Sequence, residues 1–157
     1  MNWTKLIISL VVCQLAGIIG SIFTSSSIPT WYAAIKKPAF NPPNWIFGPV
    51  WITLFVMMGI SLYLIWNLGL STKAAKIAII IFGIQLVLNT LWSILFFGLQ
   101  SPFYAFIEII ILWIFILASI ISFYPISRTA SLLLVPYILW VSFAAVLNFY
   151  IWRLNLT

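Results

Sequence analysis

The chain consists of five long apolar segments, and only a few polar or charged residues separate most of them from the next. A helix needs about 20 apolar residues to cross roughly 30 Å of hydrocarbon, and each segment reaches about that length. Strands of a closed β-barrel would alternate apolar and polar residues, whereas KIAIIIFGIQLVLNTLWSILFFG is apolar on every face. We therefore predict an all-α, polytopic membrane protein with helices over residues 5–24, 45–67, 75–98, 102–124 and 130–152.

The links between these helices are short, with one exception. GLSTK follows the second helix, LQSP the third and PISR the fourth. Short links force consecutive helices to lie antiparallel, so we expect residues 1–157 to form a single compact five-helix domain. The first loop, about residues 24–44, is longer, and its prolines should keep it ordered. Pro136 falls inside the fifth helix and should bend it near its beginning.

Charge is scarce, with seven basic residues and one acid in the chain. The basic residues near one membrane surface are Lys5, Lys73, Lys76 and Arg128, and those near the other are Lys36, Lys37 and Arg153. This distribution of charge favours a cytoplasmic N-terminus only slightly. The basic residues form no continuous stripe, so nucleic-acid binding is not expected. Glu108, the acid, lies near the start of the fourth helix, where we expect an interfacial position with a structural or snorkelling role and not a proton relay.

The sequence lacks the residues that most types of catalytic site require. Histidine is absent, and there is a single cysteine and a single carboxylate, which excludes His/Cys metal sites, Ser-His-Asp nucleophiles and paired-carboxylate hydrolysis. We expect no metal, no cofactor and no disulfide within the chain. The first apolar segment is long and ends without an A-x-A pattern, so we expect a transmembrane span there and not a cleaved signal peptide.

Two of the predicted helices carry polar or aromatic residues at steps of four, a spacing that places them on one helix face. In the third helix these are Gln85, Asn89 and Ser93, and in the fifth they are Pro136, Trp140, Ala144 and Asn148. A polar group inside lipid must face protein, ligand or water. Each line of residues therefore either forms the wall of a pocket or makes contacts and hydrogen bonds between helices.

Small residues recur at the same spacing in the first helix. They are Cys13, Gly17 and Ser21, together with Ala16 and Gly20. Small residues let two helices approach closely. The pattern serves either packing within the bundle or contact between two copies of the chain.

Three motifs resemble those of one family. They are the first loop with its W-Y-x4-K-P-x-F-x-P-P-x-W-x-F-G-P-x-W pattern (residues 31–51), LNTLWSILFFG (residues 88–98) and PYILWVSFAAVLNFYIWRLN (residues 136–155). In these the chain resembles the TspO/MBR family, which comprises the tryptophan-rich sensory proteins and the mitochondrial translocator protein, also called the peripheral-type benzodiazepine receptor. The resemblance implies a five-helix bundle, commonly a homodimer, that binds porphyrins, sterols and synthetic aromatic ligands in a pocket capped by the first loop.

Site residues follow from the resemblance position by position. Trp51 and Trp140 match two pocket tryptophans that, in some bacterial relatives, also support light-dependent porphyrin breakdown, so they are the catalytic candidates if this chain degrades porphyrin. With Asn148 added from the line of residues in the fifth helix, the expected ligand-binding residues are Tyr32, Trp51, Asn89, Trp92, Ser93, Trp140, Ala144 and Asn148. The expected lid residues are Trp31, Pro38, Phe40, Pro42 and Pro43. Lys36 and Lys37 are expected to meet either porphyrin propionates or phospholipid headgroups.

Three functions are compatible with these features. The leading one is a receptor or transporter that binds a porphyrin or another tetrapyrrole; the others are a light-dependent porphyrin-degrading enzyme and a scaffold without a ligand. Lipid and sterol are further candidate guests, although the sterol pattern Leu147-x2-Tyr150-x2-Arg153 has Phe149 where the family has its tyrosine. We expect a multi-pass protein in a prokaryotic plasma membrane in preference to an organelle membrane, and the resemblance implies a homodimer.

Overall fold

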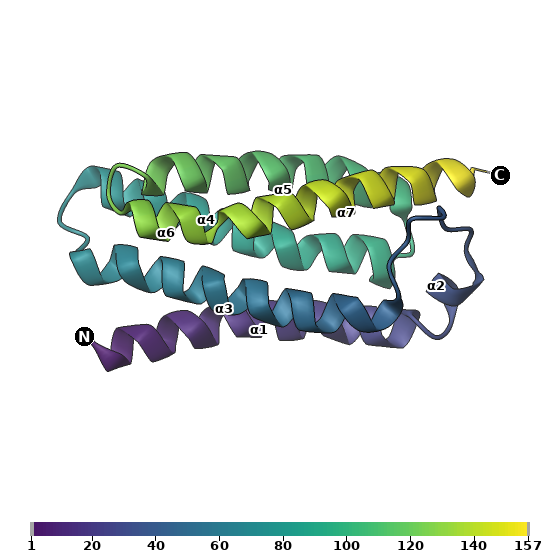
Figure 1. Ribbon diagram of the computed structural model, residues 1–157, viewed down its shortest axis with the longest axis horizontal. Helices are drawn as coiled ribbons and strands as arrows, with labels where there is room; N and C mark the ends of the chain where they lie inside the picture. The colour runs from purple at the N-terminus through teal and green to yellow at the C-terminus, as the bar shows by residue number, and fades with distance from the viewer. Residues whose placement is uncertain (1, 157) are drawn as a thin grey trace.

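The protein is a bundle of long helices, described over residues 2–156 by a computed structural model. Its elements in chain order are α1 (Trp3–Ser27), α2 (Trp31–Ala34), α3 (Asn44–Leu68), α4 (Lys73–Ser93), the π-helix η1 (Ile94–Gly98), α5 (Pro102–Phe123), α6 (Arg128–Leu133) and α7 (Val135–Leu154). Within these residues five helical segments are long and apolar enough to cross a membrane, with η1 extending α4 and α6 preceding α7. Figure 1 shows them side by side along the longest axis. The predicted all-α membrane bundle is confirmed.

Helices α1 and α3 approach closely because glycines stand where they meet. A Cβ atom on Gly59 would lie 2.9 Å from the Cα atom of Leu10, and one on Gly17 would lie 2.5 Å from the ring of Phe55. Cys13 on the same part of α1 is fully buried. Cys13 and Gly17 of the first helix are therefore used for packing inside the bundle, which is the first of the two interpretations left open by the sequence.

The fifth span is divided in two near its beginning. Helix α6 ends at Leu133, and α7 begins at Val135 with Pro136 in its first turn. Proline has no N–H to donate and its ring clashes with the carbonyl four residues earlier, so one continuous helix cannot pass through this point. The predicted bend at Pro136 is thus a break between two helices.

The first loop starts later than expected, because α1 continues to Ser27. It contains the short helix α2, and Figure 1 shows it at the same end of the bundle as the C-terminus, opposite the N-terminus. Hydrogen bonds to α7, described below, hold it there. The order predicted for this loop therefore comes from tertiary contacts as well as from its prolines.

Glu108 departs from expectation. Its side chain is only 5 % exposed, and neither carboxyl oxygen has a hydrogen-bond partner among residues 2–156. It lies on α5 between two points fixed to α7: the carbonyl of Pro102 accepts from Asn148 at 2.7 Å, and the indole N–H of Trp113 donates to Ser142 at 2.8 Å. The expected snorkelling of this side chain toward the surface is wrong, because the side chain is buried inside the bundle.

Candidate functional site

A cavity of about 480 Å³ lies between α1, α3, α4, η1 and α7, with α2 at one end. All eight residues expected from the sequence to bind a ligand lie on its wall: Tyr32, Trp51, Asn89, Trp92, Ser93, Trp140, Ala144 and Asn148. They come from four helices, α2, α3, α4 and α7. The fold therefore brings the expected residues together, while their role in binding stays a prediction.

Two tryptophans contribute flat surfaces to this wall. The ring of Trp51 on α3 lies 5.7 Å from that of Phe55 and 6.4 Å from that of Tyr137. Trp140 on α7 packs against Phe47 at 6.0 Å and against Phe143 at 5.5 Å. The aromatic neighbours fix the orientation of both indoles. The buried N–H of Trp140 has no acceptor within the described part of the chain.

Asn89 is oriented by a hydrogen-bonded chain that links α4 to α7. Its amide nitrogen donates to the hydroxyl of Tyr137 at 2.8 Å, and this hydroxyl donates to the carbonyl oxygen of the Gln85 side chain at 2.9 Å. Tyr137 is fully buried. The line of polar residues on α4 thus serves both purposes considered from the sequence, since Gln85 bonds between helices whereas Asn89 does so and also faces the cavity.

The side chains of Trp92 and Asn148 are joined by a hydrogen bond. The indole N–H of Trp92 donates to the Asn148 side-chain oxygen at 3.0 Å, and the Asn148 amide nitrogen donates to the carbonyl of Pro102 at 2.7 Å. The ring of Trp92 is also stacked on Phe96 at 5.2 Å. Because these polar groups are already hydrogen-bonded within the protein, they are not free to bond a ligand. The two residues therefore contribute mainly to the shape of the cavity wall.

Tyr32 closes the loop end of the cavity. Its side chain is 3 % exposed, its ring lies 5.6 Å from that of Phe97, and its hydroxyl donates to the side-chain oxygen of Asn41 at 2.7 Å. Burial raises the pKa of Tyr32 to about 12. The phenol is therefore neutral at physiological pH and acts as an apolar plug with one internal hydrogen bond.

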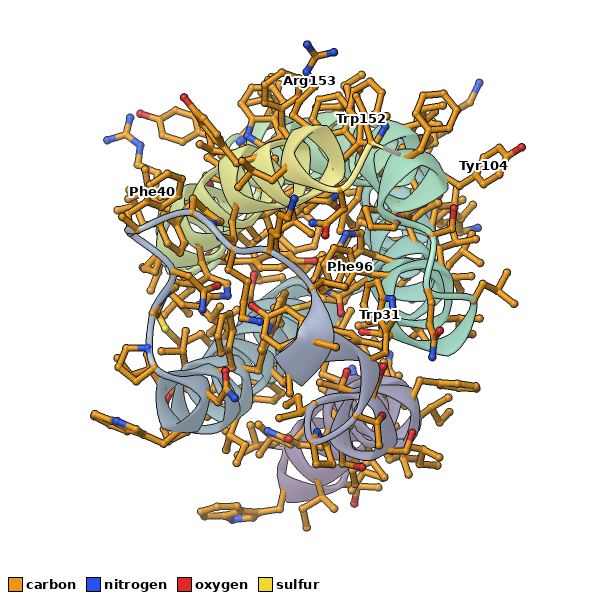
Figure 2. All side chains as sticks on the ribbon, turned by 90° about the vertical axis from the view of Figure 1, so that its right-hand side faces the viewer. Trp31, Phe40, Phe96, Tyr104, Trp152 and Arg153 are labelled. Atoms are coloured by element: carbon orange, nitrogen blue, oxygen red, sulfur yellow. The ribbon has the colours of Figure 1, made fainter. Side chains whose placement is uncertain are left out.

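The five expected lid residues lie outside the cavity wall: Trp31, Pro38, Phe40, Pro42 and Pro43. Trp31 packs edge-on against Phe96 at 5.5 Å, and Phe40 packs against Phe143 and Tyr150 of α7 at 6.3 and 5.3 Å. Figure 2 views this end and shows Trp31 beside Phe96 near its middle and Phe40 at its edge. These aromatic residues hold the loop in place, and Tyr32 is the loop side chain that closes the cavity.

Asn155 fastens the loop to the C-terminal end of α7. Its side-chain oxygen accepts from the backbone N–H of Lys36 at 3.0 Å, and its amide nitrogen donates to the carbonyl of Lys36 at 2.9 Å. The ammonium group of Lys37 donates to the backbone carbonyls of Tyr32 and Ile35 at the end of α2. Neither lysine lines the cavity, and no charged side chain does so within the described residues.

Sequence reasoning missed two wall residues and one residue behind the wall. The wall residues are Phe47, four residues before Trp51, and Phe96, four after Trp92; the residue behind the wall is Tyr137, which orients Asn89. A search for aromatic residues at helical spacing would have found the two phenylalanines. Tyr137 lies one turn before Trp140, but its contact with Asn89 spans 48 residues of sequence and leaves no local signal.

Comparison with known proteins gives a consistent result. A family model described as the TspO/MBR family matches residues 9–153. The chain is 47% identical over 155 residues to the tryptophan-rich protein TspO of Archaeoglobus fulgidus, covering 99% of each, and 46% identical over 143 residues to that of Chlorobaculum tepidum, covering 91% of this chain and 90% of the relative. It is 36% identical over 138 residues to the human translocator protein, covering 87% and 82%.

Proposed function

Because the chain belongs to the TspO/MBR family, we propose that it is a receptor or transporter that binds a porphyrin or another flat tetrapyrrole in the cavity beneath the first loop. One observation carries the proposal: the indoles of Trp51 and Trp140 and the amide of Asn89 line the same cavity. Aromatic faces suit a planar guest. A few placed polar groups in an apolar pocket are typical of small-molecule sites.

The size and lining of the cavity support this choice of guest. Its volume of about 480 Å³ lies within the range of roughly 300–1,000 Å³ usual for ligand pockets. The cavity lacks charged side chains among the described residues, so a charged carboxylate would be costly to bury there. The ring of a porphyrin would therefore occupy the cavity while its propionates stay near the headgroups.

Equilibrium binding of protoporphyrin to the protein in lipid nanodiscs tests the proposal. The Soret band of the porphyrin is the readout, because it does not depend on how many tryptophans a variant retains. Trp51→Phe and Trp140→Phe should each weaken binding by up to about tenfold, since an aromatic stacking contact contributes about 0.5–1.5 kcal/mol. Trp3→Phe is the matched control, because Trp3 is exposed and does not line the cavity. Absence of saturable binding by the wild type would exclude the proposed function.

A second candidate function is light-dependent porphyrin degradation, favoured by the presence of two indoles on one cavity wall. Illumination of the bound porphyrin should then yield a new absorbing species that Trp51→Phe and Trp140→Phe reduce. Recovery of unchanged pigment with binding intact leaves simple binding as the function. A scaffold role would instead make substitutions in the cavity change stability without changing any ligand affinity.

The protein is a multi-pass integral membrane protein, and its bacterial and archaeal relatives fit a prokaryotic membrane. The plasma membrane is the proposed location. Homodimer formation and binding of lipid or sterol remain proposals that follow from the family. A dimer would use a surface other than the Cys13–Gly17 side of α1, because that side packs within the bundle.

A further inference from the structure

The exposed part of the cavity wall lies on only two helices. The lining residues on α4, η1 and α7 are all buried or half-buried, and Tyr32 at the loop end is buried. The exposed lining residues belong to α1 and α3 and include Ile18, Ser21 and Ser25 on α1 and Trp45, Gly48 and Ile52 on α3. The cavity therefore opens sideways, through a slot between these two helices.

The slot exists because the close packing of α1 and α3 does not continue to the loop end. Close packing of Gly59 against Leu10 brings the helices together in the other half of the bundle. At Gly48, by contrast, an added Cβ would meet nothing within 4 Å. The side-chain nitrogen of Gln14 donates to the carbonyl of Ile52 at 3.3 Å and marks the inner limit of the slot. From residue 44 to residue 52, the slot runs about 12 Å along α3 at the usual helical rise.

The slot faces the hydrocarbon of the bilayer, and its lining presents few free polar groups to an apolar molecule that passes through it. The exposed lining residues belong to two segments long and apolar enough to span the membrane, Trp3–Ser27 and Asn44–Leu68. The hydroxyl of Ser21 donates to the carbonyl of Ile18 at 2.7 Å, and that of Ser25 donates to the carbonyl of Ile22. These hydroxyl groups are already bonded within α1, so a passing ring need not displace water from them.

The loop end, in contrast, is closed by several contacts. Tyr32 fills it, Asn155 holds the backbone of Lys36 at two points, and Phe40 packs against α7. Opening this end would break these contacts together. Passage between α1 and α3 would leave these contacts intact.

We infer that the slot between α1 and α3 is a lateral portal, through which a flat molecule with an apolar body passes directly between the bilayer and the cavity while the first loop stays closed. The inference rests on the proposed function for the identity of the natural guest, but the route itself applies to any flat molecule dissolved in the bilayer. The guest would enter ring first, with its polar edge trailing at the headgroup end near Ser25 and Trp45.

Fluorine NMR of fluorotryptophan-labelled protein in nanodiscs tests the route without using porphyrin. Single Trp→Phe variants assign the signals of Trp51 and Trp140. A neutral aromatic nitroxide dissolved in the bilayer should broaden both signals in the wild type, whereas a charged nitroxide confined to water should not. Gly48→Phe should protect Trp140 by filling the slot. Gly83→Phe is the matched control, because Gly83 also has open space around its Cβ position and lies on α4 away from the cavity.

The outcomes are decisive in both directions. The portal is overturned if Trp140 is not broadened by the bilayer nitroxide, if Gly48→Phe protects it no more than Gly83→Phe, or if the water-confined nitroxide reaches it more readily. If Gly48→Phe does not fold, Ser21→Phe narrows the slot from α1 and takes its place.

A kinetic experiment separates the portal from the proposed function. Gly48→Phe should slow both association and dissociation of protoporphyrin by about tenfold or more, the effect of a barrier raised by about 1.4 kcal/mol. A mere loss of binding contacts would instead speed dissociation. Protoporphyrin that fails to bind while the nitroxide still reaches Trp140 refutes the proposed guest and supports the portal. Binding at unaltered rates in Gly48→Phe refutes the portal and leaves the proposed function intact.

Discussion

The side-chain amide of Asn89 donates a hydrogen bond to the hydroxyl of Tyr137 across 2.8 Å, and this contact ties the cavity wall on α4 to α7. The same hydroxyl donates to Gln85, so one phenolic oxygen determines how two amides of α4 are oriented. The geometry of the cavity wall therefore depends in part on a residue that does not line the cavity.

Tyr137→Phe should destabilise the protein and weaken ligand binding. The change removes two buried hydrogen bonds, each worth a few tenths to about 2 kcal/mol between membrane helices, and it leaves Asn89 free to rotate. Unfolding in mixed detergent and the Soret titration measure the two effects. Tyr104→Phe is the control, because Tyr104 is 63% exposed; an equal loss in both variants would contradict the role given to Tyr137.

Ala144→Leu should reduce the affinity for a flat guest without reducing stability. Ala144 lines the cavity, so the larger side chain occupies space that the guest would use. Ala145→Leu provides the contrast, because Ala145 is buried away from the cavity wall and overpacking there should cost about 1–3 kcal/mol. Unfolding and binding measured on both variants check the distinction, and retained affinity in Ala144→Leu would count against the site.

Asn155→Ala should loosen the first loop. The backbone N–H of Lys36 would lose the acceptor it has in the structure, so hydrogen exchange at Lys36 and its neighbours should speed up. Asn67→Ala, in an exposed position at the end of α3, serves as the control. Unchanged exchange in Asn155→Ala would show that the aromatic contacts of Phe40 and Trp31 alone hold the loop.

The closed loop end should be insensitive to pH up to about pH 10 and should loosen above it. Burial raises the pKa of Tyr32 from 10.0 to about 12, so the folded state favours the neutral phenol. The stabilisation that Tyr32 contributes is complete at pH values below the pKa of its phenol in the unfolded state. It is lost as the pH rises through the pKa of the phenol in the folded state. Hydrogen exchange of the loop, followed from about pH 8 upward and compared with Tyr32→Phe, checks this, because the phenylalanine variant should lack the high-pH loosening.

Glu108→Gln should be at least as stable as the wild type. Neither oxygen of Glu108 has a hydrogen-bond partner within the described residues, and an acid in this position carries the cost of burying a group that can ionise. Reversible unfolding in mixed detergent at neutral pH is the measurement. A marked loss of stability would show that the carboxyl group makes a contact that an amide cannot replace.

Five membrane spans could be predicted from the sequence because length and apolarity along a chain are local properties. The wall residues Asn89, Trp140 and Ala144 could be found for a similar reason, since residues four apart share a face of a helix whatever the helix packs against. Both kinds of inference need no knowledge of how the helices are arranged.

The rest depends on contacts between distant parts of the chain. Lys36 and Asn155 are hydrogen-bonded although 119 residues of sequence separate them. No local sequence pattern around either residue predicts this contact. The burial of Glu108 depends on which side of α5 faces the other helices of the bundle. Phe40 and the prolines were correctly placed in an ordered loop, but only packing determines that Tyr32, and not they, reaches the cavity.

The π-helix η1 limits how this region can change in length. The backbone N–H of Leu99 donates to the carbonyl of Ile94, five residues earlier, at 2.7 Å, so this turn holds one residue more than an α-helical turn. A deletion of one residue between Ile94 and Gly98 could restore an α-helix, but it would rotate the two flanking parts by about 100° relative to each other. Trp92 and Pro102, both joined to Asn148, could then no longer meet it together. Substitutions are therefore easier to accommodate in this segment than single-residue insertions or deletions.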